Sequence, residues 1–311
     1  MTHGAHSHPA DERNDKILVD INGELVPKAQ ATVSVLDSGF ILGDGIWEGL
    51  RLHEGRLAFL DRHLRRIYDG ARAIDMDLGI TKDELTKRLA NVLNANNMHD
   101  HVHLRLMISR GVKSTPYQDP RATITGPTIV ILPEYKEPGD EVYSRGMNLF
   151  TVHVRRGRPD VQDPRLNTHS KHNCIQACIQ AAKAGADEGL MLDPQGFVAT
   201  CNSTHFFIVR RGEVWTSTGN YCLDGITRGV VIEIAREAGI PVHEKNFSLA
   251  DVYGAEEVFI TGTFAGLVSV GDVDGRSFEG PFPGEMVKRL QDLYRKRVDA
   301  EPLLAGLTVG A

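Results

Sequence analysis

Residues 34–51 read SVLDSGFILGDGIWEGLR. The last residues of the quoted stretch belong to Trp47–His53, which we predict to be one arm of a β-hairpin with Glu54-Gly55 at its tip. Upstream, apolar and polar residues alternate from Ile17 to Val35 around Asn22-Gly23, which is typical of a hairpin with a type I′ turn. The sequence therefore predicts antiparallel strands at the start of the fold.

Helices and further strands are predicted after these hairpins. Thr81 and Glu84 form a capping box, which marks the start of a helix. Two strand-like runs, Val102–Ser109 and Thr128–Leu132, complete a compact α+β unit. Before the capping box, an earlier helix is indicated by an apolar stripe made of Leu64, Ile67, Tyr68 and Ala71.

The second half of the chain alternates strands with helices. It follows PEYKEPGDEVYSRG (133–146), a polar stretch rich in turn formers that we interpret as a linker. The predicted strands are Met147–Val154, Gly189–Leu192, His205–Val209, Glu257–Ile260 and Leu267–Val270. The predicted helices are Ser170–Ala184, Thr227–Ala238 and Pro283–Val298.

These patterns predict a two-domain α+β protein. The length of 311 residues is sufficient for two domains that each bury a core. Residues 1–15 lack the apolar core of a secretory signal, so we expect a disordered tail there. The remaining divisions are a small N-terminal α+β domain (16–134), an interdomain linker (135–146) and a larger C-terminal domain (147–311).

Composition excludes several classes of function. The net charge is −6 and no basic block is present, which argues against nucleic acid or an anionic membrane as a partner. The longest uncharged run is too short to span a bilayer. The four cysteines form no CxxC pair and no zinc spacing, so we predict no metal site and a cytoplasmic, reducing location. A GxxxxGK[ST] phosphate loop is also absent.

One lysine and several small-residue loops carry the candidate chemistry. Lys171 lies in LNTHSKHNC, where a loop turns into a helix. The helix macrodipole disfavours a cation at this end and lowers its pKa, which suits an amine that forms imines. Asp224–Thr227 opens another helix and can offer backbone N–H groups to a phosphate. The loop Thr261-Gly262-Thr263 and Arg66 are further candidates for phosphate contacts.

Taken together and in this order, the motifs resemble those of the fold type IV pyridoxal-phosphate enzymes. That family includes branched-chain aminotransferases, D-amino acid aminotransferases and aminodeoxychorismate lyases. The resemblance runs from about Ile17 to Leu290. It is carried by SVLDSGFILGDGIWEGLR (34–51), DRHLRRI (61–67), LNTHSK (166–171), GITRGVVIEIAREAGIPV (225–242) and EEVFITGTFAGLVSV (256–270).

The resemblance implies a fold, a cofactor and an assembly. The fold would be a small α/β N-domain and a larger C-domain with a pseudo-barrel, and the assembly at least a homodimer. The cofactor would be pyridoxal 5′-phosphate, held by a Schiff base on Lys171. Its phosphate would be bound by Arg66, the Ile226 N–H, Thr227 and Thr263.

The chain departs from the family at the pyridine nitrogen. The stretch GFVATCNSTHFFIV (196–209) has Thr200 where the family has a glutamate, and His205 replaces a common asparagine. Ser203 falls on a small residue beside the phosphate. A threonine hydroxyl can donate a hydrogen bond to an unprotonated nitrogen but carries no charge. We therefore expect either slow transamination or an altered reaction.

The substrate-binding positions are also mixed. Arg51 and Arg105 match arginines that lie near the substrate in branched-chain aminotransferases, although both could instead be ion-paired within the N-domain. His103 replaces a usual tyrosine, and Trp47 replaces a phenylalanine and should narrow the pocket. The sequence leaves the identity and handedness of the substrate open.

The first hypothesis is a class IV aminotransferase, similar to the branched-chain enzymes, that moves an amino group between an amino acid and a 2-oxo acid. The alternatives on the same scaffold are a lyase or eliminating enzyme, favoured by Thr200, and a D-amino acid aminotransferase. A third hypothesis is a protein that binds pyridoxal phosphate with little catalysis. The presence of Lys171 alongside Arg66, Thr227 and Thr263 argues against that third hypothesis.

Overall fold

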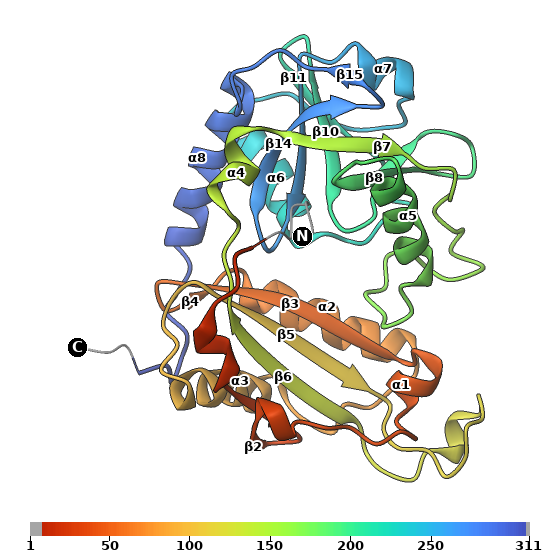
Figure 1. The fold of residues 1–311 in the computed structure, drawn as a ribbon, viewed down its shortest axis with the longest axis vertical. Helices are drawn as coiled ribbons and strands as arrows, with labels where there is room; N and C mark the ends of the chain where they lie inside the picture. Colours follow the sequence, from red (N-terminus) through yellow and green to blue (C-terminus); the bar gives the residue numbers. More distant parts are fainter. Residues whose placement is uncertain (1–7, 309–311) are drawn as a thin grey trace. The chain divides into compact units, whose positions relative to one another are not determined.

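The computed structural model describes residues 8–308, whose chain divides into two compact units (Figure 1). Each unit has its own sheet, and we call them the six-stranded unit and the nine-stranded unit. The six-stranded unit comprises Ala10–Glu137, Asn167–Ser170 and the segment that begins at Val298. The nine-stranded unit comprises Pro138–Leu166 and Lys171–Arg297.

The six-stranded unit contains an antiparallel sheet with the strand order β2-β1-β6-β5-β3-β4. Its strands are β1 (Leu18–Ile21), β2 (Glu24–Pro27), β3 (Gly45–His53), β4 (Arg56–Leu57), β5 (Val102–Ser109) and β6 (Thr128–Tyr135). Its helices include α1 (Ser38–Leu42), α2 (Leu60–Ala73) and α3 (Lys82–Ala95).

Both predicted hairpins are present in this unit. β1 and β2 are joined by Asn22 (φ 53°) and Gly23 (φ 92°), and β3 and β4 by Glu54 (φ 44°) and Gly55 (φ 76°). A type I′ turn requires a positive φ at both central residues, and the two loops meet that requirement. The predicted capping box at the start of α3 also forms.

The core of the six-stranded unit lies between one face of the sheet and helices α2 and α3. Ile46, Leu50 and Leu104 of the sheet belong to one cluster with Leu64 of α2 and Leu85 of α3, and each is at most 4% exposed. Burial of such a side chain contributes about 1.5–3 kcal/mol. The alternate residues of β3 and β5 lie on the opposite face of the sheet.

The nine-stranded unit is built on a mixed sheet with the order β12-β11-β10-β13-β14-β7-β8-β9, and β15 pairs with β14. β7 pairs in parallel with both β14 and β8. Its strands are β7 (Met147–Thr151), β8 (Glu188–Leu192), β9 (Val198–Cys201), β10 (His205–Arg210), β11 (Glu213–Thr216), β12 (Val242–Glu244), β13 (Glu257–Gly262), β14 (Gly266–Val273) and β15 (Arg276–Ser277). Its helices are α4 (Asp140–Ser144), α5 (His172–Lys183), α6 (Ile226–Glu237), α7 (Leu249–Tyr253) and α8 (Glu285–Asp299).

Two segments differ from the expected organisation. The stretch 135–146, for which we expected a linker, contains the end of β6 and helix α4, because Val142 of α4 is buried in the core of the nine-stranded unit. Glu12–Asp15, in the expected tail, form a 3-10 helix whose Asn14 is hydrogen-bonded to the backbone of Tyr135. Residues 1–7 of that tail lie outside the described residues.

The C-terminal part of the chain also does not form one continuous block. Asn167–Ser170 belong to the six-stranded unit, and so does the segment from Val298 on. Thr168 forms a β-bridge with Ile46 of β3, and Leu304 is buried in the core of the same unit. Backbone pairing and apolar burial therefore attach both segments to the earlier part of the chain.

Across 8–308, no helix is both long and apolar enough to cross a membrane. The same residues contain no cluster of three or more His, Cys, Asp or Glu side chains that could hold a metal ion. The four cysteines are free thiols.

Candidate active site

Lys171 is the residue immediately before helix α5, at the helix N-terminus where the sequence predicts it. The helix itself starts at His172. α5 lies close to β8, because a Cβ on Gly189 would come within 3.0 Å of the Ala177 carbonyl oxygen. Ala177 is fully buried at this contact. Small residues thus fix α5, and with it the backbone of Lys171, against the sheet.

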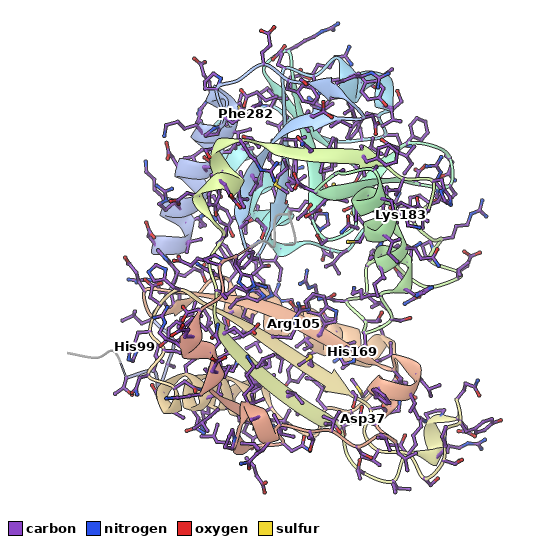
Figure 2. All side chains as sticks on the ribbon, viewed as in Figure 1. Asp37, His99, Arg105, His169, Lys183 and Phe282 are labelled. Carbon is purple, nitrogen blue, oxygen red and sulfur yellow. The ribbon has the colours of Figure 1, made fainter. Side chains whose placement is uncertain are left out.

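The residues that precede Lys171 are paired with the edge of β3. The Trp47 N–H donates to the Asn167 carbonyl (2.9 Å), and the His169 N–H donates to the Gly45 carbonyl (2.9 Å). A Cβ on Gly45 would come within 2.6 Å of the Ile108 carbonyl oxygen, so only glycine fits at this position. His169 is labelled in Figure 2, beside the strands of the six-stranded unit. The chain segment that precedes Lys171 is therefore fixed by backbone hydrogen bonds.

Helix α6 offers an anion-binding end in the nine-stranded unit. Its N-cap is Gly225, which makes no side-chain capping hydrogen bond. The first N–H groups of any helix lack acceptors within the helix, and they favour an anion. Ile226 and Thr227 supply the first two of these N–H groups, and both residues are buried.

Two other segments lie against this helix end or against each other. A Cβ on Gly225 would come within 2.1 Å of His205 Nε2, so the imidazole packs directly on the N-cap residue. His205 pairs with Thr261 across β10 and β13, just before Gly262 and Thr263. Gly262 in turn lies against Thr204. We call Ser203–His205, Gly225–Thr227 and Thr261–Thr263 the cradle, whose small residues and helix N-terminus fit a phosphate group.

Thr200 is buried and its hydroxyl is committed to the protein. Its Oγ1 donates to the Thr204 carbonyl at 2.8 Å. This differs from our expectation that the hydroxyl donates to a ring nitrogen, because its single hydrogen is already used. The oxygen keeps lone pairs, so the hydroxyl can still accept a hydrogen bond from a protonated nitrogen.

Arg66 lies on α2 in the six-stranded unit and is held by a buried carboxylate. Its Nε and Nη2 each lie 2.7 Å from an oxygen of Glu48. His63 Nδ1 lies 2.6 Å from the same carboxylate. Burial raises the pKa of Glu48, but the charge of Arg66 and the contact with His63 outweigh it and leave that pKa lowered. The orientation of the guanidinium is therefore set by an ionised Glu48.

Glu48 is a residue of the candidate site that the sequence did not indicate. It stands within GDGIWEGLR, between residues that were assigned to the substrate. The alternation of β3 puts its side chain on the face of the helices, whereas Trp47 lies on the opposite face. A carboxylate at a core position of a strand is the signal that could have identified it.

The four predicted substrate residues share one face of the six-stranded sheet. Arg51 is paired with His103, and Arg105 with Gly49, so alternation puts these side chains on the same face as Trp47. The Arg105 guanidinium lies 3.8 Å from the centre of the Trp47 ring. Burial lowers the pKa of Arg105. Arg105 is labelled in Figure 2, on the central strands of this sheet.

The two arginines differ in their partners. Arg51 Nη2 forms an ion pair with Glu137 Oε1 (3.2 Å), and its Nη1 donates to the Lys136 carbonyl. These contacts hold Arg51 within the six-stranded unit. Arg105 stacks the flat face of its guanidinium on the Trp47 ring, whereas the N–H groups of a guanidinium point outward in its plane. His103 packs its ring on Gly49, within 3.1 Å of a Cβ built there.

Sequence comparisons identify relatives along most of the chain. The profile of the amino-transferase class IV family matches residues 45–273. The putative branched-chain-amino-acid aminotransferase of Methanocaldococcus jannaschii is 38% identical over 88% of this chain and 94% of its own. The branched-chain-amino-acid aminotransferase-like protein 2 of Arabidopsis thaliana is 36% identical over 92% of this chain, which spans only 51% of that relative. The D-alanine aminotransferase of Staphylococcus haemolyticus is 28% identical over 91% of this chain and 98% of its own.

Solved structures share the fold. The branched-chain aminotransferase of Thermoproteus uzoniensis with norvaline has a TM-score of 0.82 and 28% identity over 90% of this chain and 94% of its own. The T.th. branched-chain amino acid aminotransferase with pyridoxamine 5′-phosphate has a TM-score of 0.85 and 27% identity over 94% of this chain and 97% of its own. The two-domain, fold type IV architecture expected from the sequence is thereby confirmed.

Proposed function

Because the chain belongs to the class IV aminotransferase family, we propose that it is a pyridoxal-phosphate-dependent aminotransferase. It transfers an amino group between an amino acid and a 2-oxo acid, in the manner of the branched-chain enzymes. The observation that carries this proposal is the start of α5, where Lys171 is held in the unit that also contains the cradle. A lysine at a helix N-terminus, in the same unit as an anion-binding helix end, is the combination that an imine-forming phosphate cofactor requires.

The family resemblance assigns the phosphate of the cofactor to groups that are described unit by unit. In the nine-stranded unit these are the Ile226 N–H, Thr227 and Thr263, with Ser203 beside them. In the six-stranded unit the resemblance assigns Arg66, whose guanidinium is oriented by Glu48. Support for this assignment comes from the first N–H groups of α6, which have no acceptor within the helix, and from its N-cap glycine, against which His205 packs.

The cofactor, when bound, supplies the electron-withdrawing group that makes the Cα proton of the amino acid acidic. Lys171 Nζ takes up that proton as a general base and later returns it as a general acid. Thr200 would accept a hydrogen bond from the ring nitrogen rather than donate one, because its hydrogen is given to the Thr204 carbonyl. A hydroxyl that accepts at this position is compatible with a protonated ring nitrogen, so this hydrogen-bond direction supports transamination more than the sequence suggested.

The face of the six-stranded sheet opposite helices α2 and α3 would bind the substrate. Arg105 binds the substrate carboxylate through the edge of its guanidinium, while its flat face stacks on Trp47. His103 lies beside it, next to Arg51, and Trp47 limits the size of the side chain that can enter. The stack on Trp47 and the ion pair of Arg51 favour Arg105 over Arg51 for this role.

Amino transfer to a 2-oxo acid, measured with a panel of L- and D-amino acids, tests the proposal. Lys171→Ala should abolish transfer, and borohydride reduction of the wild type with pyridoxal phosphate should label Lys171. The matched control is Lys183→Ala, an exposed lysine in the last turn of the same helix. Figure 2 labels Lys183. A label on Lys183, or transfer by Lys171→Ala, would remove the assignment.

D-amino acid transfer is a second candidate function. The observation that favours it is the set of D-alanine aminotransferases among the relatives, at 28–29% identity over 91% of this chain. The same panel separates the two candidates, because only one enantiomer should be consumed. Release of a 2-oxo acid without any acceptor would instead favour the lyase or eliminating reaction.

A homodimer and a cytoplasmic location complete the proposal. The six-stranded unit exposes three large apolar side chains on neighbouring segments, Val35 (73%), Phe40 (71%) and Ile124 (67%). The segments are joined by hydrogen bonds from Lys113 N to Leu36 O and from Ile124 N to Val112 O. A contiguous apolar patch on a protein surface marks an interaction site. The free thiols support a reducing compartment.

A further inference from the structure

The turn between β9 and β10 is fastened to the start of β8 by a buried carboxylate. Glu188 is 2% exposed. Its Oε1 accepts a hydrogen bond from Ser203 Oγ at 2.9 Å, and its Oε2 accepts one from Thr204 Oγ1 at 2.8 Å. Two consecutive residues of the turn therefore donate to one side chain.

The backbone fastens the same turn at its other residues. Asn202 exchanges two hydrogen bonds with Gly189, from Gly189 N to Asn202 Oδ1 (2.6 Å) and from Asn202 N to the Gly189 carbonyl (3.0 Å). Cys201 N donates to the Thr204 carbonyl at 2.9 Å. We call Glu188 and Gly189, with the turn Cys201–Thr204, the β8 latch. Each turn residue takes part in it.

Thr204 connects this latch to Thr200. The Thr204 carbonyl accepts the Thr200 hydroxyl at 2.8 Å, while the Thr204 hydroxyl donates to Glu188. The Thr200 hydroxyl thus points toward the backbone of Thr204, and Glu188 holds the side chain of that same residue. The direction of the Thr200 hydroxyl therefore depends on the position of Thr204. Ser203, on the same turn, belongs to the cradle.

We propose that Glu188 is a positioning residue, which holds the Cys201–Thr204 turn and thereby orients Thr200 and Ser203 toward the cofactor. This inference rests on the proposed function, because it assigns the turn to the cofactor site. Glu188 itself acts through Thr204 and Ser203 and is given no contact with the reacting atoms.

The latch requires the ionised carboxylate. An ionised carboxylate only accepts hydrogen bonds, so both of its oxygens can receive a hydroxyl, whereas a protonated one carries a hydrogen on one oxygen. Burial raises the pKa of Glu188 to about 7, although the hydroxyls of Thr204 and Ser203 oppose that rise. Asp187, which is paired with Arg145, adds a further increase. The latch is therefore closed above about pH 7 and loosened below it.

A further titratable neighbour, Cys201, does not reverse this expectation. Cys201 lies on β9 beside Glu188, and burial raises the pKa of its thiol well above the ordinary value. The thiol is therefore neutral through the range in which Glu188 titrates. Loss of the proton from Glu188 is the event that changes the latch between pH 6 and 8.

Glu188→Gln and Glu188→Ala test the proposal, with Asp193→Asn as the matched control. Asp193 is a buried carboxylate at the opposite end of the β8–β9 hairpin, where it accepts hydrogen bonds from Gln195 N and Phe197 N. Each protein is titrated with pyridoxal phosphate by absorbance at pH 6, 7 and 8, and melting of the cofactor-free proteins is measured in parallel.

The wild type should bind pyridoxal phosphate about tenfold more weakly at pH 6 than at pH 8, beyond any change seen in Glu188→Gln. Glu188→Gln should lose this extra pH dependence, and Glu188→Ala should bind at least about tenfold more weakly at every pH. Asp193→Asn should shift the melting temperature without altering the pH dependence. The same pH dependence in wild type and Glu188→Gln would overturn the proposal, even if Glu188→Ala failed to fold.

Failure of the proposed function and failure of the role of Glu188 give different experimental results. If wild-type protein shows no pyridoxal-phosphate absorbance and no borohydride label on Lys171, then the proposed function is wrong. If the wild type is labelled but the Glu188 variants bind and absorb as it does, then only the role of Glu188 is wrong.

Discussion

Arg66 and Glu48 form a bidentate ion pair in which the carboxylate is only 1% exposed. A charge-assisted contact of this kind is directional, and the fork of the guanidinium leaves its remaining N–H groups aimed in one direction. The proposed position of Arg66 on the phosphate thus depends on a residue that faces the core. One buried carboxylate orients a candidate binding residue in each unit, Glu48 in one and Glu188 in the other.

Removal of the Arg66 side chain should weaken the binding of pyridoxal phosphate. A charge-assisted hydrogen bond contributes about 1.5–3 kcal/mol, so Arg66→Ala should lower affinity roughly 10- to 100-fold in an absorbance titration. The matched control is Arg65→Ala, the exposed neighbour on the same helix. Wild-type affinity in Arg66→Ala would put the phosphate elsewhere.

Glu188 should also make the stability of the protein depend on pH. Its pKa is raised by burial from 4.5 in the unfolded chain to about 7 in the native state, so the native state binds the proton more tightly. The resulting stability is present below pH 4.5 and is lost as the pH rises to 7. The difference amounts to roughly 3 kcal/mol.

Urea denaturation at pH 5.5 and pH 8 measures this contribution. The side chain in Glu188→Gln does not ionise. As the pH rises, the free energy of unfolding of the wild type should therefore fall relative to that of Glu188→Gln. Asp193→Asn again serves as the reference. An unchanged difference between Glu188→Gln and the wild type at the two pH values would show that Glu188 titrates at its ordinary pKa.

The sequence motifs indicate candidate residues for contact with the ligand. They do not indicate the residues that orient those candidates. Lys171 lies at a helix N-terminus, as the local sequence indicates. Glu48 and Glu188 act through partners 15 to 18 residues away in sequence, and only the folded chain brings them together. The hydrogen bond of the Thr200 hydroxyl was missed for a related reason, since its acceptor is a backbone carbonyl of a tight turn.

At the scale of elements, periodic segments could be predicted and short ones could not. β5 begins and ends as predicted, and α3 starts at its capping box. The strands β9, β11 and β12 hold only three or four residues, too few to show a period. The pairing of Asn167–His169 with β3 arises from long-range hydrogen bonds, which no local pattern indicates.

Gly45 allows two strands and the Asn167–His169 segment to pack together. Gly45→Ala should destabilise the protein by about 1–3 kcal/mol, because the new methyl group meets the Ile108 carbonyl oxygen at 2.6 Å. Gly126→Ala is the matched control, since a Cβ there has no neighbour within 4 Å. Equal stability of the two variants in urea denaturation would contradict this packing argument.

At the scale of the whole molecule, the exposed patch of Val35, Phe40 and Ile124 should decide assembly. Sedimentation equilibrium of the wild type should give twice the mass of one chain. Phe40→Ser should shift the protein toward monomer, because burying a phenylalanine contributes about 1.5–3 kcal/mol to an interface. Val161→Ser, at an even more exposed apolar position in the nine-stranded unit, should not. A dimer unaffected by Phe40→Ser would put the contact on another surface.

The return of the C-terminal segment to the six-stranded unit determines when that unit can be completed during synthesis. Leu304 is buried in its core, its N–H donates to the Gly55 carbonyl, and the Glu301 carbonyl accepts from Arg56. The ribosome makes these residues more than 160 positions after β6. Until they emerge, the nascent six-stranded unit exposes the apolar site that Leu304 fills. Vectorial folding from the N-terminus is therefore interrupted here, and the first unit to begin folding is the last to close.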